Sequence, residues 1–84
     1  MNRYLVESTH KADDCHHVLE QFVFHGFIYN YEWGCLTGVH SGWAIVEAEN
    51  ESQALLTVPP LLRSKAHVVP LSKFTPEMIQ AYHN

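Results

Sequence analysis

The 84-residue chain has few basic residues and no long apolar run. Lysine and arginine together number five against nine acidic residues, and the five are scattered along the sequence. Proteins that bind nucleic acids through the phosphates need a basic patch, so we expect no nucleic-acid partner. The apolar runs are much shorter than the roughly 20 residues that cross a bilayer, so we expect no membrane partner.

Cysteine is also scarce and occurs only at Cys15 and Cys35. The first residues alternate as in a strand and lack the apolar core of a signal peptide, which predicts a cytoplasmic protein with reduced thiols. Two cysteines at this separation match no common zinc motif. Cys15 falls on the apolar stripe of a predicted helix, so we interpret it as a buried, inert thiol, with nucleophilic chemistry as the alternative.

Hydrophobic residues make up 46% of the chain, which is enough for a packed core, whereas charged residues make up only 17%. The length suits one domain, and we assign residues 1–84 to it. A domain of this size buries only about 60% of the surface that its unfolded chain exposes, and metals or oligomerisation often add the missing stability.

Apolar alternation predicts strands at residues 3–9, 27–36, 43–49 and 66–72, and 3.6-residue periodicity predicts helices at 11–26 and 50–58. Gly26 is expected to end the first helix, and Asn50 with Gln53 forms a capping-box pattern for the second. Thr75 and Pro76 predict the start of a short terminal helix over residues 76–83.

This order predicts an α+β fold of the ferredoxin-like βαββαβ type, a four-stranded antiparallel sheet with both helices on one face and a short C-terminal helix. The first and third strands should be central. Tyr4, Val6 and Ala44 suit the face beneath the helices. The opposite face carries Trp43 and Ile45 and is too apolar for water, so we expect a homodimer that buries it.

The element order over nearly the whole chain resembles the dimeric α+β barrel superfamily. The segments RYLVES, EWGCLTGVHSGWAIVEAE and SKFTPEMIQAYH are also similar to a small uncharacterised bacterial protein family. The superfamily resemblance implies a cavity between two helix-free sheet faces and does not imply a particular reaction.

Glu7 and Glu47 are expected on the helix-free face of adjacent strands. Buried carboxylates on an apolar wall need a partner, a proton or a cation, so either one is a candidate acid or base. The alternative is that they reach the rim and stay solvated, and a one-residue register shift would move either carboxylate to the other face.

Histidine is abundant, with seven residues. His40 lies in a glycine-flanked loop beside Trp43, and His10 follows a central strand. We consider His10, His40 and Cys35 candidate ligands for a transition metal such as zinc, nickel or copper, and expect no other cofactor. Surface histidines explain the same pattern, since no pair at helical i, i+4 spacing occurs.

The sequence therefore predicts a small-molecule-binding dimeric barrel, with a ligand site composed of Glu7, Trp33, His40, Trp43 and Glu47. The aromatic residues among these equally suit dimer contacts. The alternatives are a metal-binding protein and a cofactor-free isomerase or oxygenase that uses Glu7, Glu47 or His40 for proton transfer. Whether the protein is an enzyme stays open.

Overall fold

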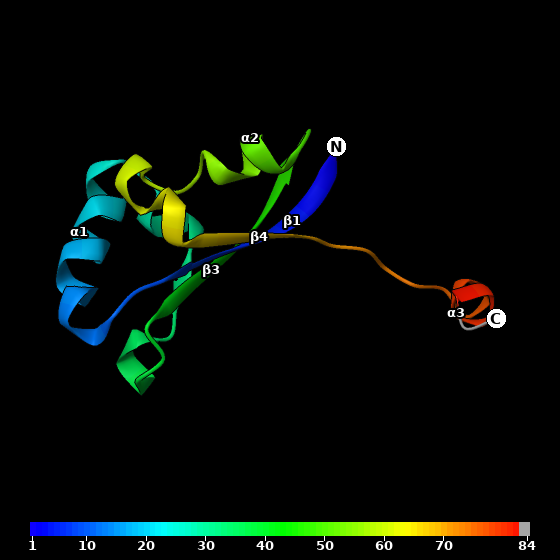
Figure 1. Cartoon of the computed structure of the whole chain (residues 1–84), viewed down its shortest axis with the longest axis horizontal. Coiled ribbons are helices and arrows are strands. Elements are labelled where there is room, and N and C mark those ends of the chain that lie inside the picture. The colour runs from blue at the N-terminus through cyan, green and yellow to red at the C-terminus, as the bar shows by residue number, and fades with distance from the viewer. Residues whose placement is uncertain (83–84) are drawn as a thin grey trace.

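The computed structural model describes residues 1–82, which alternate between strands and helices in the order that the sequence predicts (Figure 1). The strands are β1 (Asn2–Thr9), β2 (Glu32–Trp33), β3 (Ser41–Ala48) and β4 (Ala66–Pro70). The α-helices are α1 (Cys15–Phe24), α2 (Glu51–Leu55) and α3 (Pro76–Tyr82). Short 3₁₀ segments connect them: η1 (Ala12–Asp14), η2 (Ile28–Asn30), η3 (Cys35–Thr37) and η4 (Pro60–Lys65).

Within residues 1–82 the strands form one four-stranded antiparallel sheet in the order β2-β3-β1-β4. The prediction that the first and third strands are central is confirmed. Tyr4 lies opposite Val46 and Thr9 opposite Ser41, so β1 and β3 pair along their whole length. An α+β fold with this sheet is therefore established.

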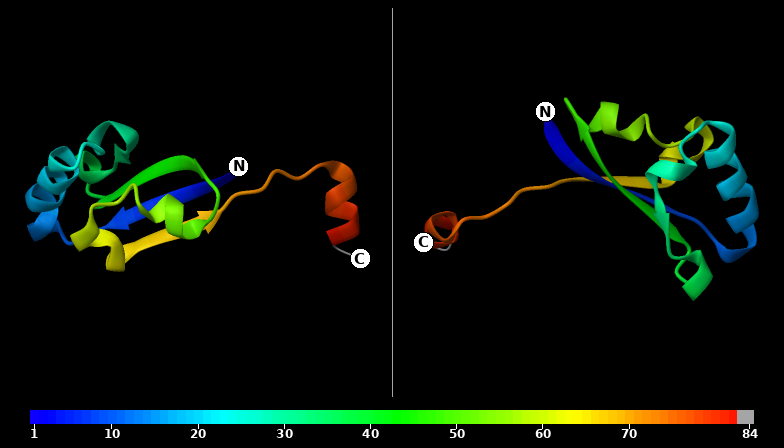
Figure 2. Two further views of the ribbon diagram at one scale, coloured as in Figure 1. Left: turned by 90° about the horizontal axis from the view of Figure 1, so that it is seen from above. Right: turned by 180° about the vertical axis from the view of Figure 1, so that it is seen from behind.

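The core lies between the sheet and helices α1 and α2, which cover the same face (Figure 2). Alternate residues of the two central strands point into it, as predicted: Tyr4, Val6, Ala44 and Ala48 are all buried. Val18 and Phe22 of α1 and Ala54 of α2 pack against them. The opposite, helix-free face leaves Ile45 58% exposed.

The predicted caps are present at the helix ends. The Asn50 side chain accepts a hydrogen bond from the Gln53 amide at 2.8 Å, and the Gln53 side chain accepts one from the Glu49 amide at 3.0 Å. Gly26 ends the α1 segment with a φ of 81°, in the left-handed region that glycine adopts without steric cost. Thr75 caps α3 through the Met78 amide at 3.2 Å.

The second strand differs most from its prediction. A strand over residues 27–36 is wrong, because only Glu32 and Trp33 pair with β3 and 3₁₀ turns flank them. The Trp33 ring lies directly over Gly42, where a Cβ atom would come within 2.5 Å of the ring. The chain therefore bends around the packed indole instead of continuing along the sheet edge.

Smaller differences concern individual boundaries and faces. The first helix begins with the 3₁₀ segment η1, and α1 ends at Phe24. Val23 on α1 is 60% exposed. The second helix ends at Leu55, before Pro59, and β4 ends at Pro70. Position 83 of the predicted terminal helix lies outside the described residues.

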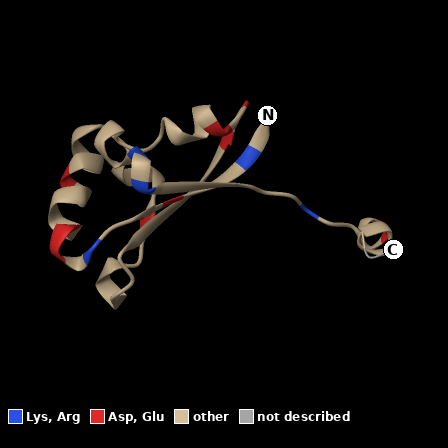
Figure 3. Ribbon diagram, in the orientation of Figure 1, with Lys and Arg blue, Asp and Glu red and all other residues tan. Residues whose placement is uncertain are grey.

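Arg63 and Lys65 lie together in η4, whereas the other lysine and arginine residues lie in separate parts of the chain, so the basic residues form no extended stripe (Figure 3). In residues 1–82, no helix is long and apolar enough to cross a membrane.

Candidate metal centre

Four side chains that can bind a metal meet at one end of the sheet: His10, Cys15, Cys35 and His40. Each contributes one ligand atom, and the four atoms all lie within 4.8 Å of one another. We call these residues the His/Cys cluster. They come from the end of β1, the start of α1 and the loop between β2 and β3.

The register of the two central strands brings the histidines together. Thr9 and Ser41 form the last residue pair of β1 and β3, and their hydroxyl groups lie 2.8 Å apart. His10 follows Thr9 and His40 precedes Ser41, so the antiparallel strands place these two residues opposite each other. The His10 amide donates a hydrogen bond to the His40 carbonyl at 3.0 Å, and the ring centroids lie 5.6 Å apart.

The loop that carries Cys35 and His40 is held by its own backbone. The amides of Thr37 and Val39 each donate to the Gly34 carbonyl at 3.0 Å, and the Gly38 amide donates to the Cys35 carbonyl at 3.1 Å. Gly38 has a φ of 90°, a conformation that a side chain would disfavour. These bonds fold the loop back so that Cys35 and His40 face the same space.

Cys15 reaches the cluster because α1 begins beside the end of β1. The η1 segment turns the chain sharply after His10, and the Asp14 amide donates to the Lys11 carbonyl at 3.0 Å. Cys15 is the first residue of α1 and is half-buried. The prediction that it is fully buried in the apolar stripe is therefore wrong.

One distance in the cluster matches a tetrahedral metal site, and the others lie within 4.8 Å, so the side chains would close slightly around a metal. Metal–nitrogen and metal–sulfur distances of about 2.0–2.3 Å place ligand atoms about 3.3–3.8 Å apart in a tetrahedron. The Cys35 Sγ and His10 Nε2 atoms lie 3.6 Å apart. Two thiolates and two neutral imidazoles also neutralise a divalent cation, which suits a partly buried position.

Burial favours the neutral forms of His10 and Cys35 in the cluster. Burial lowers the pKa of His10 from 6.5, the nearby His40 lowers it further, and Asp14 opposes both effects. Burial also raises the pKa of the Cys35 thiol, and the Cys15 thiol adds to this rise. In the absence of a metal, the neutral imidazole and the neutral thiol are thus favoured.

Three buried nitrogen atoms around the cluster lack a hydrogen-bond partner among the described residues: His10 Nδ1, His40 Nδ1 and Trp33 Nε1. His10 is only 9% exposed. Buried polar atoms are nearly always satisfied in native proteins, and of these three only the imidazole nitrogens can bind a metal, because the Trp33 Nε1–H is a donor only. With His10 Nε2 facing Cys35, a metal on that atom would keep the proton on Nδ1, which would still need an acceptor.

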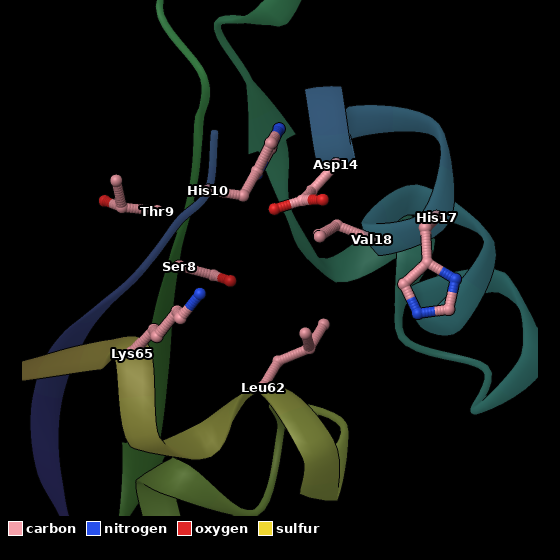
Figure 4. Close-up of a pocket in the computed structure, with 8 residues that line it drawn as sticks. All are labelled: Ser8, Thr9, His10, Asp14, His17, Val18, Leu62 and Lys65. Atoms are coloured by element: carbon pink, nitrogen blue, oxygen red, sulfur yellow. The ribbon is translucent and has the colours of Figure 1, made fainter. Parts of the chain in front are cut away.

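A cavity of about 220 Å³ adjoins the cluster between β1, α1 and η4 (Figure 4). His10 forms part of its wall, and the Ser8 and Lys65 side chains point into the space (Figure 4). The Asp14 carboxylate lies beside His10 in the same view, consistent with its effect on the His10 pKa.

The residues predicted to bind a small molecule do not line one cavity. Glu7, Trp43 and Glu47 lie on the helix-free face, where the Trp43 indole donates to Glu7 at 2.8 Å. Trp33 lies on the helix-covered face, with its ring centroid 4.8 Å from that of Phe22. His40 belongs to the His/Cys cluster.

Glu7 and Glu47 share a face but not a site. Glu7 lies opposite Trp43 in the register and Glu47 lies opposite Arg3. Four residues of strand, about 13 Å, therefore separate the two carboxylates along the sheet. At this separation the carboxylates do not bind one small group together.

Sequence reasoning selected three members of the cluster and missed Cys15. A signal was present, because each cysteine is five positions from a histidine: His10 precedes Cys15, and Cys35 precedes His40. The spacing between the two cysteines alone does not show these mixed pairs. The mirrored H-x₄-C and C-x₄-H pattern is the sequence signal for the cluster.

We expect metal affinity to fall as the pH is lowered from 7.5 to 5.5. Metal binding displaces the thiol protons, and the lowered pKa of His10 means that the folded chain favours the neutral ring. In the unfolded chain His10 takes up a proton near its ordinary pKa of 6.5, whereas in the folded chain it does so only at lower pH. The contribution of His10 to the stability of the fold is therefore present above pH 6.5 and is lost as the pH falls below it. Competition with a chromogenic chelator at several pH values measures the affinity.

The control for this pH dependence is His67→Gln, because His67 is exposed and lies outside the cluster. The variant should reproduce the profile of the unmodified chain. An affinity that stays constant over this pH range would contradict binding by cysteine and histidine.

No family model, no curated protein and no solved structure matches this chain. Function is therefore inferred from the site itself.

Proposed function

We propose that the protein is a metal-binding domain in which His10, Cys15, Cys35 and His40 bind one zinc ion. The observation that carries this proposal is the convergence of four ligand atoms within 4.8 Å from three separate parts of the chain. Two sulfur and two nitrogen ligands in a tetrahedral arrangement favour zinc over metals that prefer oxygen ligands or planar geometry.

The role that best fits this site is structural. Four protein ligands complete the coordination of tetrahedral zinc, whereas catalytic zinc keeps a position for water or substrate. The metal would connect the end of β1, the start of α1 and the β2–β3 loop, whose order otherwise depends on short hydrogen-bonded turns. Such a link adds stability that a small domain cannot obtain from its hydrophobic core alone.

The test is elemental analysis with native mass spectrometry on the untagged chain. We expect one zinc per chain after loading with a zinc salt and desalting, and its loss after chelation. The Cys35→Ser variant should retain less than a tenth of the metal, and His67→Gln should retain all of it. Stoichiometric zinc in Cys35→Ser, or none in the unmodified chain, would rule out this site.

A homodimer that buries the helix-free face is our second proposal. Ile45 and Val69 support it, because they are 58% and 46% exposed on that face. The strand order and the one-sided helices also support a ferredoxin-like classification and, with it, the small-molecule cavity of the barrel type. A shallow hollow lined by Leu5, Trp43 and Ile45 is the surface that such a cavity would use.

We propose the cytoplasm as the location of the protein. The free thiols of Cys15 and Cys35 support this, since reducing compartments preserve thiolate ligands.

A further inference from the structure

The C-terminal residues leave the domain as an arm. The Leu71 amide still bonds to the Arg3 carbonyl at 2.9 Å, beyond the end of β4. The chain then runs away from the sheet and ends in α3 (Figure 1). The longest dimension of the molecule is consequently 47 Å, against 28 and 21 Å in the other directions.

The arm carries an apolar surface that is exposed to solvent. Phe74 is 59% exposed, Met78 46% and Ile79 44%. Helix α3 has only seven residues. Isolated helices shorter than about 12 residues are marginal in water, so α3 requires packing against another surface.

A matching surface exists on the helix-free face of the sheet. Leu5 lies opposite Ile45 on one side and opposite Val69 on the other, so the three side chains form a row across β3, β1 and β4. Ile45 is 58% exposed and Val69 46% exposed. We call these three residues the apolar row, and neither helix that packs on the sheet covers it.

The sequence of the arm opposes its return to the same sheet. Residues 72–75 are Ser-Lys-Phe-Thr, in which only Ser72 has a turn preference. Thr75 precedes Pro76, which restricts it to extended conformations. Four extended residues span about 13 Å, and the chain carries α3 beyond its own sheet (Figure 1).

We propose that two copies of this chain exchange their arms, so that Phe74, Met78 and Ile79 of each α3 pack on the apolar row of the partner copy. A two-fold axis makes the two contacts equivalent and closes the assembly at a dimer. The exchange covers the apolar surface of the arm and the apolar row with one another. It specifies the contact of the homodimer proposed above, places the α3 of the partner copy over Leu5 and Ile45 in place of a small molecule, and is independent of the metal site.

Sedimentation velocity on the untagged full-length chain tests the assembly, and we expect twice the 9.7 kDa mass of one chain. Ile79→Asp should weaken the dimer at least tenfold, whereas Gln80→Asp, the same charge at the next position of α3, should not. Ile45→Asp should reproduce the effect from the other side of the contact. Because α3 lies outside the core, Ile79→Asp leaves the fold intact even if Ile45→Asp disturbs it.

Photo-crosslinking identifies which copy receives the arm. A benzophenone side chain in place of Met78, in a mixture of ¹⁴N- and ¹⁵N-labelled chains, should give mixed-isotope crosslinks to the β3 or β4 peptides. A monomer, or crosslinks within one chain only, would overturn arm exchange. A dimer that Ile79→Asp leaves unchanged would overturn arm exchange too, while leaving the homodimer and the metal site standing.

Discussion

Chelating the zinc that we propose for the His/Cys cluster should lower the melting temperature of this domain by roughly 10–20 °C. A ligand present at 100 times its dissociation constant stabilises the folded state by about 2.7 kcal/mol, and in a domain of this size each 1 kcal/mol shifts the midpoint by about 4–8 °C. The effect is large because the His/Cys cluster joins β1, α1 and the β2–β3 loop. Thermal unfolding followed by circular dichroism, with chelator and after zinc is restored, measures it.

The matched control for chelation is Cys35→Ser, which removes one sulfur ligand and keeps the size of the side chain. Its melting temperature should be the same with and without chelator and should lie close to that of the chelated parent chain. An equal chelator effect in this variant would mean that the metal binds elsewhere. No effect in the parent chain would contradict the structural role.

Phe22→Ala should cost about 3–5 kcal/mol of the free energy of unfolding, because it removes a large buried side chain and leaves a cavity. Phe22 is fully buried, and its ring centroid lies 4.8 Å from those of both Tyr31 and Trp33. The total free energy of unfolding of a small domain is about 5–15 kcal/mol, so the variant should lose a large part of its stability. Urea unfolding followed by tryptophan fluorescence measures the loss.

Phe24→Ala is the control for this substitution. It makes the same chemical change two residues later on α1, where Phe24 is 80% exposed. We expect a change within about 0.5 kcal/mol. Equal losses in the two variants would show that the buried face of α1 has been assigned wrongly.

Much of the fold could be predicted because its signals are local. Asn50 with Gln53, Gly26, and Thr75 before Pro76 mark helix ends through bonds to backbone groups a few residues away. The second strand could not be predicted in the same way. Its alternating pattern is typical of a strand, but Trp33 packs over Gly42 and Phe22, and these long-range contacts bend the chain.

The candidate site was predicted only in part. His10, His40 and Cys35 were selected as ligands because of their residue types and their places near loops. Cys15 was assigned to the helix stripe, since helical periodicity describes a side chain within its own helix and not the turn before it. The 3₁₀ segment η1 sets the direction in which α1 begins and so brings Cys15 to the cluster.

The sequence by itself determined the order of the elements, the alternation that buries Tyr4, Val6 and Ala44, and the inventory of two thiols and seven imidazoles. Only the tertiary structure decided which of these groups meet. The pairing of Thr9 with Ser41 places His10 opposite His40, and a shift of one residue would turn each side chain to the other face. Register depends on packing across the whole sheet, so the H-x₄-C and C-x₄-H spacings mark two candidate ligand pairs but do not show that the two pairs meet.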